Sequence, residues 1–163
     1  VREKNSMPDL RALLRTNRSY WRETAHVKRW PKMVDSRGRE LKPPPPDRRS
    51  AKPGEVWGVA VSSGVARGRV KVLSTPFEKP LERGEVLVAR MTDPGWTPLF
   101  PVCEAVILEV GGALQHGALV AREYNKPCVA GIEDCVSRFS DGQLVEVDGT
   151  RGIVRIIDEH EHH

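Results

Sequence analysis

The sequence predicts an α/β fold: a compact β/α domain in which β-rich flanks surround a strand–helix–strand unit, preceded by a helical segment and a proline-rich linker. Three observations support this prediction. An almost wholly apolar run, residues 105–110, leads through a double glycine into a stretch with helical periodicity, residues 116–124. Short β-rich runs punctuated by glycine and proline flank this unit. Four consecutive prolines, residues 43–46, exclude regular helix or sheet there.

Length and composition indicate one globular domain with additional segments. The chain has 163 residues, of which 39% are hydrophobic and 29% charged. No apolar stretch is long enough to span a membrane, so we expect a cytoplasmic protein without a membrane partner. The net charge of +4 arises in the N-terminal third, where arginine-rich helical faces are usually solvated, so we expect no nucleic-acid partner. The three cysteines show no CxxC spacing, which favours reduced thiols and argues against zinc.

Residues 1–42 are predicted to be a basic helical segment. Leucines 10, 13 and 14, Asn17 and Trp21 follow helical spacing within a helix that we expect over residues 8–30, with arginines on the other faces. So narrow an apolar stripe makes a marginal helix unless a partner surface covers it. The chain also begins with Val1 rather than Met. We therefore expect this segment to connect to an upstream domain of a longer polypeptide.

Residues 43–54 are predicted to be a stiff linker with a reach of roughly 35 Å, since polyproline geometry rises ~3.1 Å per residue. Residues 55–158 form the predicted domain, and residues 159–163 a polar tail. The strands expected in that domain cover residues 56–61, 69–73, 86–89, 105–110 and 128–132, followed by a hairpin of residues 144–147 and 153–157.

One histidine is placed where an anion can bind. His116 follows Gly111 and Gly112 and comes at the start of the predicted helix of residues 116–124. A helix N-terminus offers free N–H groups and the positive end of the helix dipole. An imidazole is mostly neutral at pH 7, so one ring nitrogen keeps a free lone pair. His116 can therefore act as a nucleophile toward phosphorus, and the same dipole favours the phosphorylated product.

The residues that follow His116 are expected to support it. Gly117 keeps the first helical turn small, and the two preceding glycines permit positive φ and leave room for a phosphate. Leu119 and Val120 are expected to pack the helix onto the sheet. Arg122 lies about 240° around the helix from His116, so we expect it to contact the sheet or a partner domain.

Other interpretations of the histidine stay open on spacing alone. A lone histidine near glycines is usually structural or passive. A metal site is disfavoured because no second ligand stands at the required spacing. A Ser-His-Asp site using Ser62, Ser63 or Ser74 is conceivable, but none of these serines lies on a recognisable nucleophile elbow.

From Gly54 to Ile157 the sequence resembles the mobile, or swivelling, phosphohistidine domain of the phosphoenolpyruvate-utilising enzymes. The matching motifs occur in the family's order. They are residues 92–94 with Pro98, residues 111–123 with their Gly-Gly pair and His-Gly-Ala triplet, Pro127, and Gly142 with residues 145–149. The resemblance implies that His116 takes a phosphoryl group from an ATP-grasp domain and passes it to an acceptor on another domain. It also implies that Thr92, Gly111, Gly112, Gln115 and Gly117 border the phosphate.

The resemblance further implies a phosphotransferase module that is inactive alone. ATP and Mg²⁺ are expected on the ATP-grasp domain of the same polypeptide, which would convert ATP to AMP and phosphate, and no metal is expected here. Gln115 replaces the Ser, Thr or Cys found before the histidine in many members, and Leu114 replaces the regulatory threonine of some dikinases. Regulation by phosphorylation of that position is therefore not expected.

Because no barrel domain follows the final strand, the sequence looks closest to the C-terminal domain of rifampicin phosphotransferases and phosphoenolpyruvate synthase-like proteins. The expected acceptor is an antibiotic-like small molecule, or pyruvate. Ligases of the prodigiosin-synthesising type share that layout and activate a small-molecule carbonyl, which is one alternative. A docking domain that keeps this fold without phosphotransfer is another.

Overall fold

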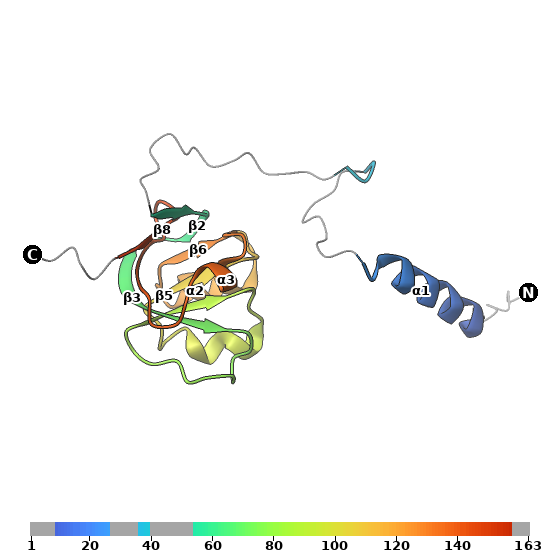
Figure 1. The fold of residues 1–163 in the computed structure, drawn as a ribbon, viewed down its shortest axis with the longest axis horizontal. Helices are drawn as coiled ribbons and strands as arrows, with labels where there is room; N and C mark the ends of the chain where they lie inside the picture. Colours follow the sequence, from blue (N-terminus) through green and yellow to red (C-terminus); the bar gives the residue numbers. More distant parts are fainter. Residues whose placement is uncertain (1–8, 27–35, 40–53, 158–163) are drawn as a thin grey trace, which may run out of the picture. The chain divides into compact units, whose positions relative to one another are not determined.

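The computed structural model describes residues 9–26, 36–39 and 54–157. The chain divides into two units, Val1–Pro44 and Pro45–His163. In the first unit, helix α1 (Leu10–Thr24) begins after Asp9, whose carboxylate accepts a hydrogen bond from the Arg11 N–H at 3.0 Å (Figure 1). Residues 25 and 26 form a turn, so the predicted helix of residues 8–30 is too long. Most of the predicted linker and the whole polar tail lie outside the described residues.

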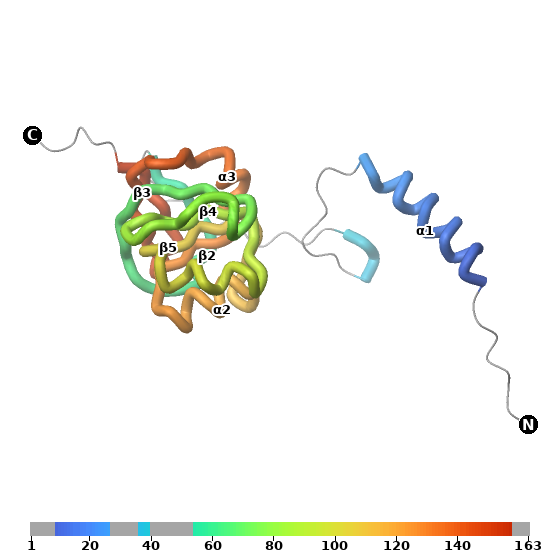
Figure 2. Tube along the Cα trace, turned by 90° about the horizontal axis from the view of Figure 1, so that it is seen from below, coloured from blue at the N-terminus to red at the C-terminus, as the bar shows by residue number. Residues whose placement is uncertain are grey.

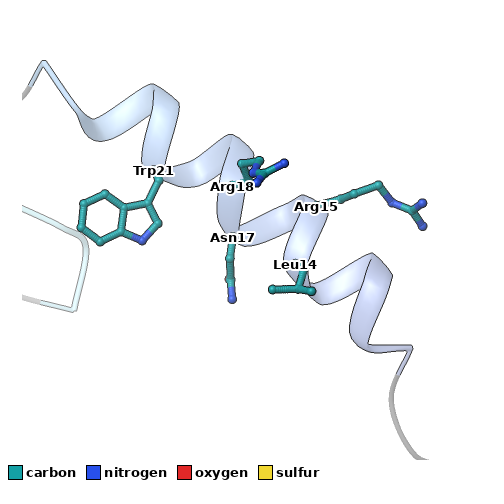
Figure 3. A pocket seen from close by; sticks show the side chains of 5 residues that line it. All are labelled: Leu14, Arg15, Asn17, Arg18 and Trp21. Carbon is teal, nitrogen blue, oxygen red and sulfur yellow. The ribbon is translucent and has the colours of Figure 1, made fainter.

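The predicted apolar stripe of α1 exists and is uncovered within the described residues. No residue of α1 is buried. The side chains of Leu14, Asn17 and Trp21 project from the same side of the helix and line a hollow together with Arg15 and Arg18 (Figure 3). In the described part of the chain, no helix has the length and apolar composition needed to cross a membrane.

The second unit is built on one eight-stranded sheet with the order β1-β8-β7-β3-β4-β5-β6-β2. Its centre, β3 to β6, is parallel, and the remaining pairs are antiparallel. The strands are β1 (Glu55–Trp57), β2 (Val59–Ser62), β3 (Val65–Leu73), β4 (Glu85–Ala89), β5 (Ala105–Leu108), β6 (Cys128–Ala130), β7 (Leu144–Asp148) and β8 (Ile153–Ile156).

Gly58 connects the two edges of this sheet. Strands β1 and β2 lie at opposite ends of the strand order, yet only Gly58 separates them in the chain. The sheet must therefore curl until its edges approach each other, as in a barrel. A Cβ on Gly58 would lie 2.5 Å from the Ala130 carbonyl oxygen, so this closure requires glycine. The single strand predicted over residues 56–61 is therefore wrong: it is two strands that pair with different neighbours.

Both faces of the parallel centre are buried. Leu87, Val106 and Cys128 belong to the hydrophobic cluster that includes helix α2 (His116–Glu123). Val86 and Ile107 belong to the opposite cluster, which includes Cys135 of the short helix α3 (Cys135–Arg138). The two helices accordingly lie on opposite sides of the sheet (Figure 2). Burial on both faces explains why residues 105–108 are apolar throughout.

The other predicted elements differ from the structure mainly at their ends. The strand predicted over residues 69–73 starts earlier, at Val65, because its first half pairs with β7. The strands predicted over residues 105–110 and 128–132 end two residues earlier than expected. Helix α3 and the 3₁₀ helix η1 (Pro94–Leu99) were not predicted, since both are too short to show apolar periodicity.

Candidate functional site

The residues expected at the site follow the carboxyl ends of adjacent parallel strands. Thr92 comes after β4, and the Gly111-Gly112 loop comes after β5 and leads into α2. Parallel strands bring their carboxyl ends to one edge of a sheet, where α/β proteins bind ligands. The next strand contributes to the same edge, because a Cβ on Gly111 would lie 2.8 Å from the Cβ of Ala130 at the end of β6.

Helix α2 begins at His116, as its sequence predicts. Gln115 is the N-cap residue, with extended φ and ψ of −81° and 158°. Its carbonyl oxygen accepts hydrogen bonds from the N–H groups of Ala118 and Leu119 at 3.0 and 3.1 Å. Among the described residues, no backbone acceptor is found for the N–H groups of His116 and Gly117. Two donors at the positive end of the helix dipole are thus available to an anion.

Two buried polar atoms near this helix start have no partner within the described residues: Nε2 of His116 and Oγ1 of Thr92. Gly117 permits the approach of Thr92, because a Cβ at that position would lie 2.6 Å from Oγ1 of Thr92 and 2.7 Å from Cδ1 of Leu108. Buried polar groups are rarely left without hydrogen bonds, and exceptions often mark functional sites. Because Nε2 of His116 is buried and has no hydrogen-bond partner within the described residues, the ring must turn outward to present that atom to a substrate.

Gly111 and Gly112 act differently from the expectation. Neither residue has a positive φ, so the left-handed freedom of glycine is not used here. Gly111 is needed for its close approach to Ala130, where any side chain would collide. Gly112 has open space where a Cβ would point, with no atom within 4 Å. This open space, one turn of chain before His116, leaves room for a ligand.

Gln115 is exposed and its side chain makes no capping hydrogen bond to the helix. Its Oε1 atom lies 3.7 Å from the position of a Cβ on Gly111, so the amide extends over the glycine loop. The amide is therefore close to the open space beside Gly112 and is not used by the helix cap.

The packing of α2 is partly as expected. Val120 is buried, and Arg122 contacts the sheet through a 2.7 Å hydrogen bond from its Nε to the Val61 carbonyl oxygen. Leu119 does not pack onto the sheet: 46% of it is exposed. It follows His116 by three residues and lies on the exposed face of the helix.

The edge also holds a charged pair that was not predicted from the sequence. Nε of Arg90 lies 3.6 Å from Oε1 of Glu109, and the two residues directly follow β4 and β5. The sequence could have indicated this pair, because residues at equivalent positions after adjacent parallel strands lie close together. The partly buried Glu109 and the exposed Arg90 balance each other's charge beside the glycine loop.

The other nucleophiles of the domain are unsuited to catalysis. Burial raises the pKa of Cys103, Cys128 and Cys135 to about 12, so these thiols stay protonated at neutral pH. No hydrogen bond joins His116 to a serine among the described residues, and no cluster of three or more His, Cys, Asp or Glu side chains is found there for a metal. Among the described residues, the imidazole of His116 is thus the candidate nucleophile at this edge.

Several known proteins are similar in sequence to part of this chain. Residues 81–152 match the family described as PEP-utilising enzyme, mobile domain. The rifampicin phosphotransferase of Bacillus cereus is 44% identical over 102 residues, which are 63% of this chain and 12% of that protein. The phosphoenolpyruvate synthase of Aeropyrum pernix is 45% identical over 129 residues, which are 76% of this chain and 16% of that protein.

Solved structures share the architecture. Aconitase X of Thermococcus kodakaraensis, in its holo-form, superposes with a TM-score of 0.52 at 20% identity, over 64% of this chain and 98% of that one. Such low identity is evidence for the fold alone. The sequence match, in contrast, includes the glycine loop, the histidine and the first turn of α2. Residues 81–152, which contain these features, are therefore similar in sequence to the mobile domain of the PEP-utilising enzymes.

Proposed function

We propose that this domain is a phosphohistidine carrier. In this proposal His116 accepts a phosphoryl group from an ATP-binding domain and delivers it to an acceptor bound elsewhere in the polypeptide. The observation that supports it most directly is the start of α2, where an imidazole with an unpartnered Nε2 adjoins two free backbone N–H groups and the open space beside Gly112. The similarity of residues 81–152 to the mobile domain of the PEP-utilising enzymes supports the same role.

The chemistry consists of three displacements at phosphorus, which together yield the AMP and phosphate that the resemblance implies. In the first, a lone pair of the His116 ring forms an N–P bond to the β-phosphorus of ATP while the bond to the AMP oxygen breaks, and that oxygen keeps the electron pair. In the second, water attacks the terminal phosphorus, loses its proton to solvent and releases phosphate, which leaves one phosphoryl group on the ring. In the third, an acceptor oxygen attacks that phosphorus, loses its proton to solvent, and the N–P bond returns its electrons to the ring. The free N–H groups of His116 and Gly117 stabilise the charge on the phosphoryl oxygens in these steps.

Thr92 and Gln115 are proposed to complete the phosphate site. The Thr92 hydroxyl is buried beside Gly117 and free to donate to a phosphoryl oxygen, and the Gln115 amide extends over the glycine loop. ATP and Mg²⁺ are proposed to bind the ATP-grasp domain of the same polypeptide, and no metal is assigned to this domain. The carrier is therefore expected to have no turnover as an isolated chain.

The acceptor is proposed to be a small organic molecule. The relatives are named for rifampicin and for phosphoenolpyruvate, which suggests an antibiotic-like compound or pyruvate. This chain spans 12% and 16% of those two relatives, and the proposal assigns the acceptor site to another domain of the polypeptide. In the same proposal, residues 1–42 connect to an upstream domain, and residues 43–54 form the tether on which the carrier moves between sites.

The test uses the full-length polypeptide with radiolabelled ATP and Mg²⁺. We expect protein-bound label that is lost in acid and kept in base, as phosphohistidine requires. His116→Ala should abolish this label, whereas His26→Ala, a change in an exposed histidine outside the domain, should leave it intact. Label that survives His116→Ala, or its absence from the unmodified protein, would contradict the carrier and favour a docking domain without chemistry.

A further inference from the structure

Helix α1 has an extended apolar surface along one side. Successive residues of an α-helix are turned by about 100° from one another, so their order gives the angular position of each side chain. The large apolar side chains of α1 fall within an arc of about 120°, which we name the apolar arc. Its members are Leu10, Leu13, Leu14, Tyr20 and Trp21. Each of them is between 46% and 74% exposed, so nothing in the described part of the chain covers the apolar arc.

The basic residues of α1 all lie along one edge of the apolar arc. They are Arg11, Arg15, Arg18 and Arg22. These four side chains occupy a strip about 60° wide next to Leu14, which we name the arginine edge. Arg15 and Arg18 leave the helix on a different side from Trp21 (Figure 3). Within the described residues, none of the four guanidinium groups forms an ion pair. The charge of α1 is therefore concentrated on one side of its apolar surface and is not neutralised there.

The side of α1 opposite the apolar arc is polar and satisfied by the helix itself. The Thr16 hydroxyl donates a hydrogen bond to the Ala12 carbonyl oxygen at 3.1 Å. The Ser19 hydroxyl donates one to the Thr16 carbonyl oxygen at 3.0 Å. These groups need no partner outside the helix. A surface that binds α1 is thus expected to contact the apolar arc and the arginine edge and to leave this side in water.

One polar residue interrupts the apolar arc near its middle. The side chain of Asn17 points to the same side of the helix as those of Leu14 and Trp21 (Figure 3). Its amide has no hydrogen-bond partner within the described residues. An apolar surface alone would remove water from this amide without replacing its hydrogen bonds, which is unfavourable. A surface that covers the arc must therefore supply a hydrogen-bonding group opposite Asn17, and single asparagines in helix interfaces are known to select partners in this way.

These features together favour a protein groove over other surfaces. A lipid bilayer covers apolar side chains but offers no hydrogen-bonding group to Asn17 in its apolar region. A nucleic acid would bind the arginine edge through its phosphates and leave the apolar arc in water. A second copy of α1 brings four more arginines and a single acidic residue, Glu23, so the arginine edge would stay without carboxylates. Carboxylates suit this edge, because they accept two parallel hydrogen bonds from the planar guanidinium group.

We propose that α1 lies lengthwise in an apolar groove elsewhere in the same polypeptide. One wall of this groove carries a row of carboxylates that faces the arginine edge, and its floor carries a hydrogen-bonding group opposite Asn17. Helices that bind in grooves use anchors at positions i, i+3, i+4 and i+7. In α1 these positions are Leu10, Leu13, Leu14 and Asn17.

The comparison with the Aeropyrum pernix protein supports a groove in the same polypeptide. The match covers 76% of this chain, which is more than the unit Pro45–His163, so the similarity continues into the first unit. The aligned part is 16% of that protein, which leaves most of its length for a groove. Docking of α1 would fix the residues before the linker of residues 43–54 in place. That consequence rests on the proposed carrier function, whereas the docking itself does not.

The first test measures amide hydrogen exchange of α1 in the full-length polypeptide. A helix of 15 residues is marginal alone, so protection of its amides reports docking. Removing two charged partners with Arg15→Gln and Arg18→Gln should lower this protection about tenfold. The control, Thr16→Glu with Ser19→Glu, changes the net charge equally on the opposite side and should lower protection less than about twofold. Equal effects of the two double variants, or an unprotected α1 in the unmodified protein, would overturn the proposal.

The second test locates the surface that α1 contacts. The photo-cross-linking residue p-benzoylphenylalanine replaces Trp21 in the full-length polypeptide or, as a control, Ser19 on the far side of the helix. Peptides joined by illumination are then identified by mass spectrometry. We expect position 21 to cross-link within its own chain, to a segment outside the 163 residues that is rich in Asp and Glu. Position 19 should cross-link several times less often, and equal yields at the two positions would contradict a groove.

The substitution Asn17→Leu distinguishes a groove from a membrane. In the groove it leaves the group opposite Asn17 unpaired, so protection of α1 should fall about fivefold. On vesicles of phosphatidylserine and phosphatidylcholine the same change should strengthen binding, because it completes the apolar arc. Vesicle binding that Asn17→Leu strengthens, without cross-links inside the chain, would overturn the groove and assign α1 to a lipid surface. Cross-links between two chains would overturn it in favour of self-association. None of these readouts uses the labelling of His116, so failure of the groove and failure of the carrier are distinguishable.

Discussion

At the scale of single residues, the site depends on glycines, because they carry no side chain to fill the space beside them. Gly117 leaves the space that the Thr92 hydroxyl occupies, and Gly112 leaves open space before the histidine. The cost of this arrangement is two buried polar atoms without partners, on His116 and Thr92. Orphaned groups of this kind reduce stability by about 1–3 kcal/mol each. In the proposed carrier, the phosphoryl group would supply their partner.

The substitution Gly117→Ala should therefore destabilise the domain. Its Cβ would lie 2.6 Å from Thr92 Oγ1 and 2.7 Å from Leu108 Cδ1, closer than packed atoms allow. We expect a loss of about 1–3 kcal/mol in the free energy of unfolding, measured by urea denaturation. Gly112→Ala is the control, since its Cβ would meet no atom within 4 Å. Equal effects of the two changes would refute this account of the site.

At the scale of elements, helix α2 holds both His116 and the backbone N–H groups that are proposed to bind the phosphoryl group. Its first turn offers the free N–H groups, and its later residues fix it to the sheet through Val120 and Arg122. The Arg122 guanidinium reaches the Val61 carbonyl oxygen on β2, one of the two strands that close the sheet. The orientation of the helix is thus linked to the closure of the barrel.

Arg122→Met should weaken this link. The substitution removes a charge-assisted hydrogen bond and leaves the Val61 carbonyl without its side-chain partner, so we expect about 1.5 kcal/mol of lost stability in denaturant unfolding. Methionine retains much of the apolar stem, which limits other effects. Glu123→Gln, at an exposed position of the same helix, should change stability by less than about 0.5 kcal/mol. If both variants lose the same free energy of unfolding, the Arg122–Val61 hydrogen bond does not hold the helix on the sheet.

At the scale of the whole molecule, the chain divides into two units, and within the described residues a buried core is found in the second of them. The unit Pro45–His163 holds the closed sheet and both hydrophobic clusters. In the unit Val1–Pro44, helix α1 buries none of its residues within the described segments. A domain that carries its own core can keep its fold while it travels between sites on other domains.

Removing residues 1–53 should leave the stability of the domain unchanged. The core residues of the sheet all lie between Val56 and Val154, so the truncated chain keeps every buried contact. We expect a melting temperature within about 2 °C of that of the 163-residue chain in calorimetry. A markedly lower melting temperature would show instead that the N-terminal unit stabilises the domain.

The sequence by itself determined the features that depend on local order. Periodicity identified helix α2, the apolar run of β5 and the final hairpin, and the Gly-Gly-to-His116 order predicted that the histidine stands at a helix start. These features need only neighbouring residues, so a local pattern contains them. The resemblance to a family then connected them to phosphoryl transfer.

Only the tertiary structure decided the features that join distant residues. The division of residues 56–61 at Gly58, the closure of the sheet and the meeting of Arg90 with Glu109 all depend on which strands become neighbours. A local stretch of sequence does not determine the order of strands in the sheet, because the pairing of strands depends on burying both faces of the sheet at once. The exposure of Leu119 likewise depends on which face of α2 the sheet covers.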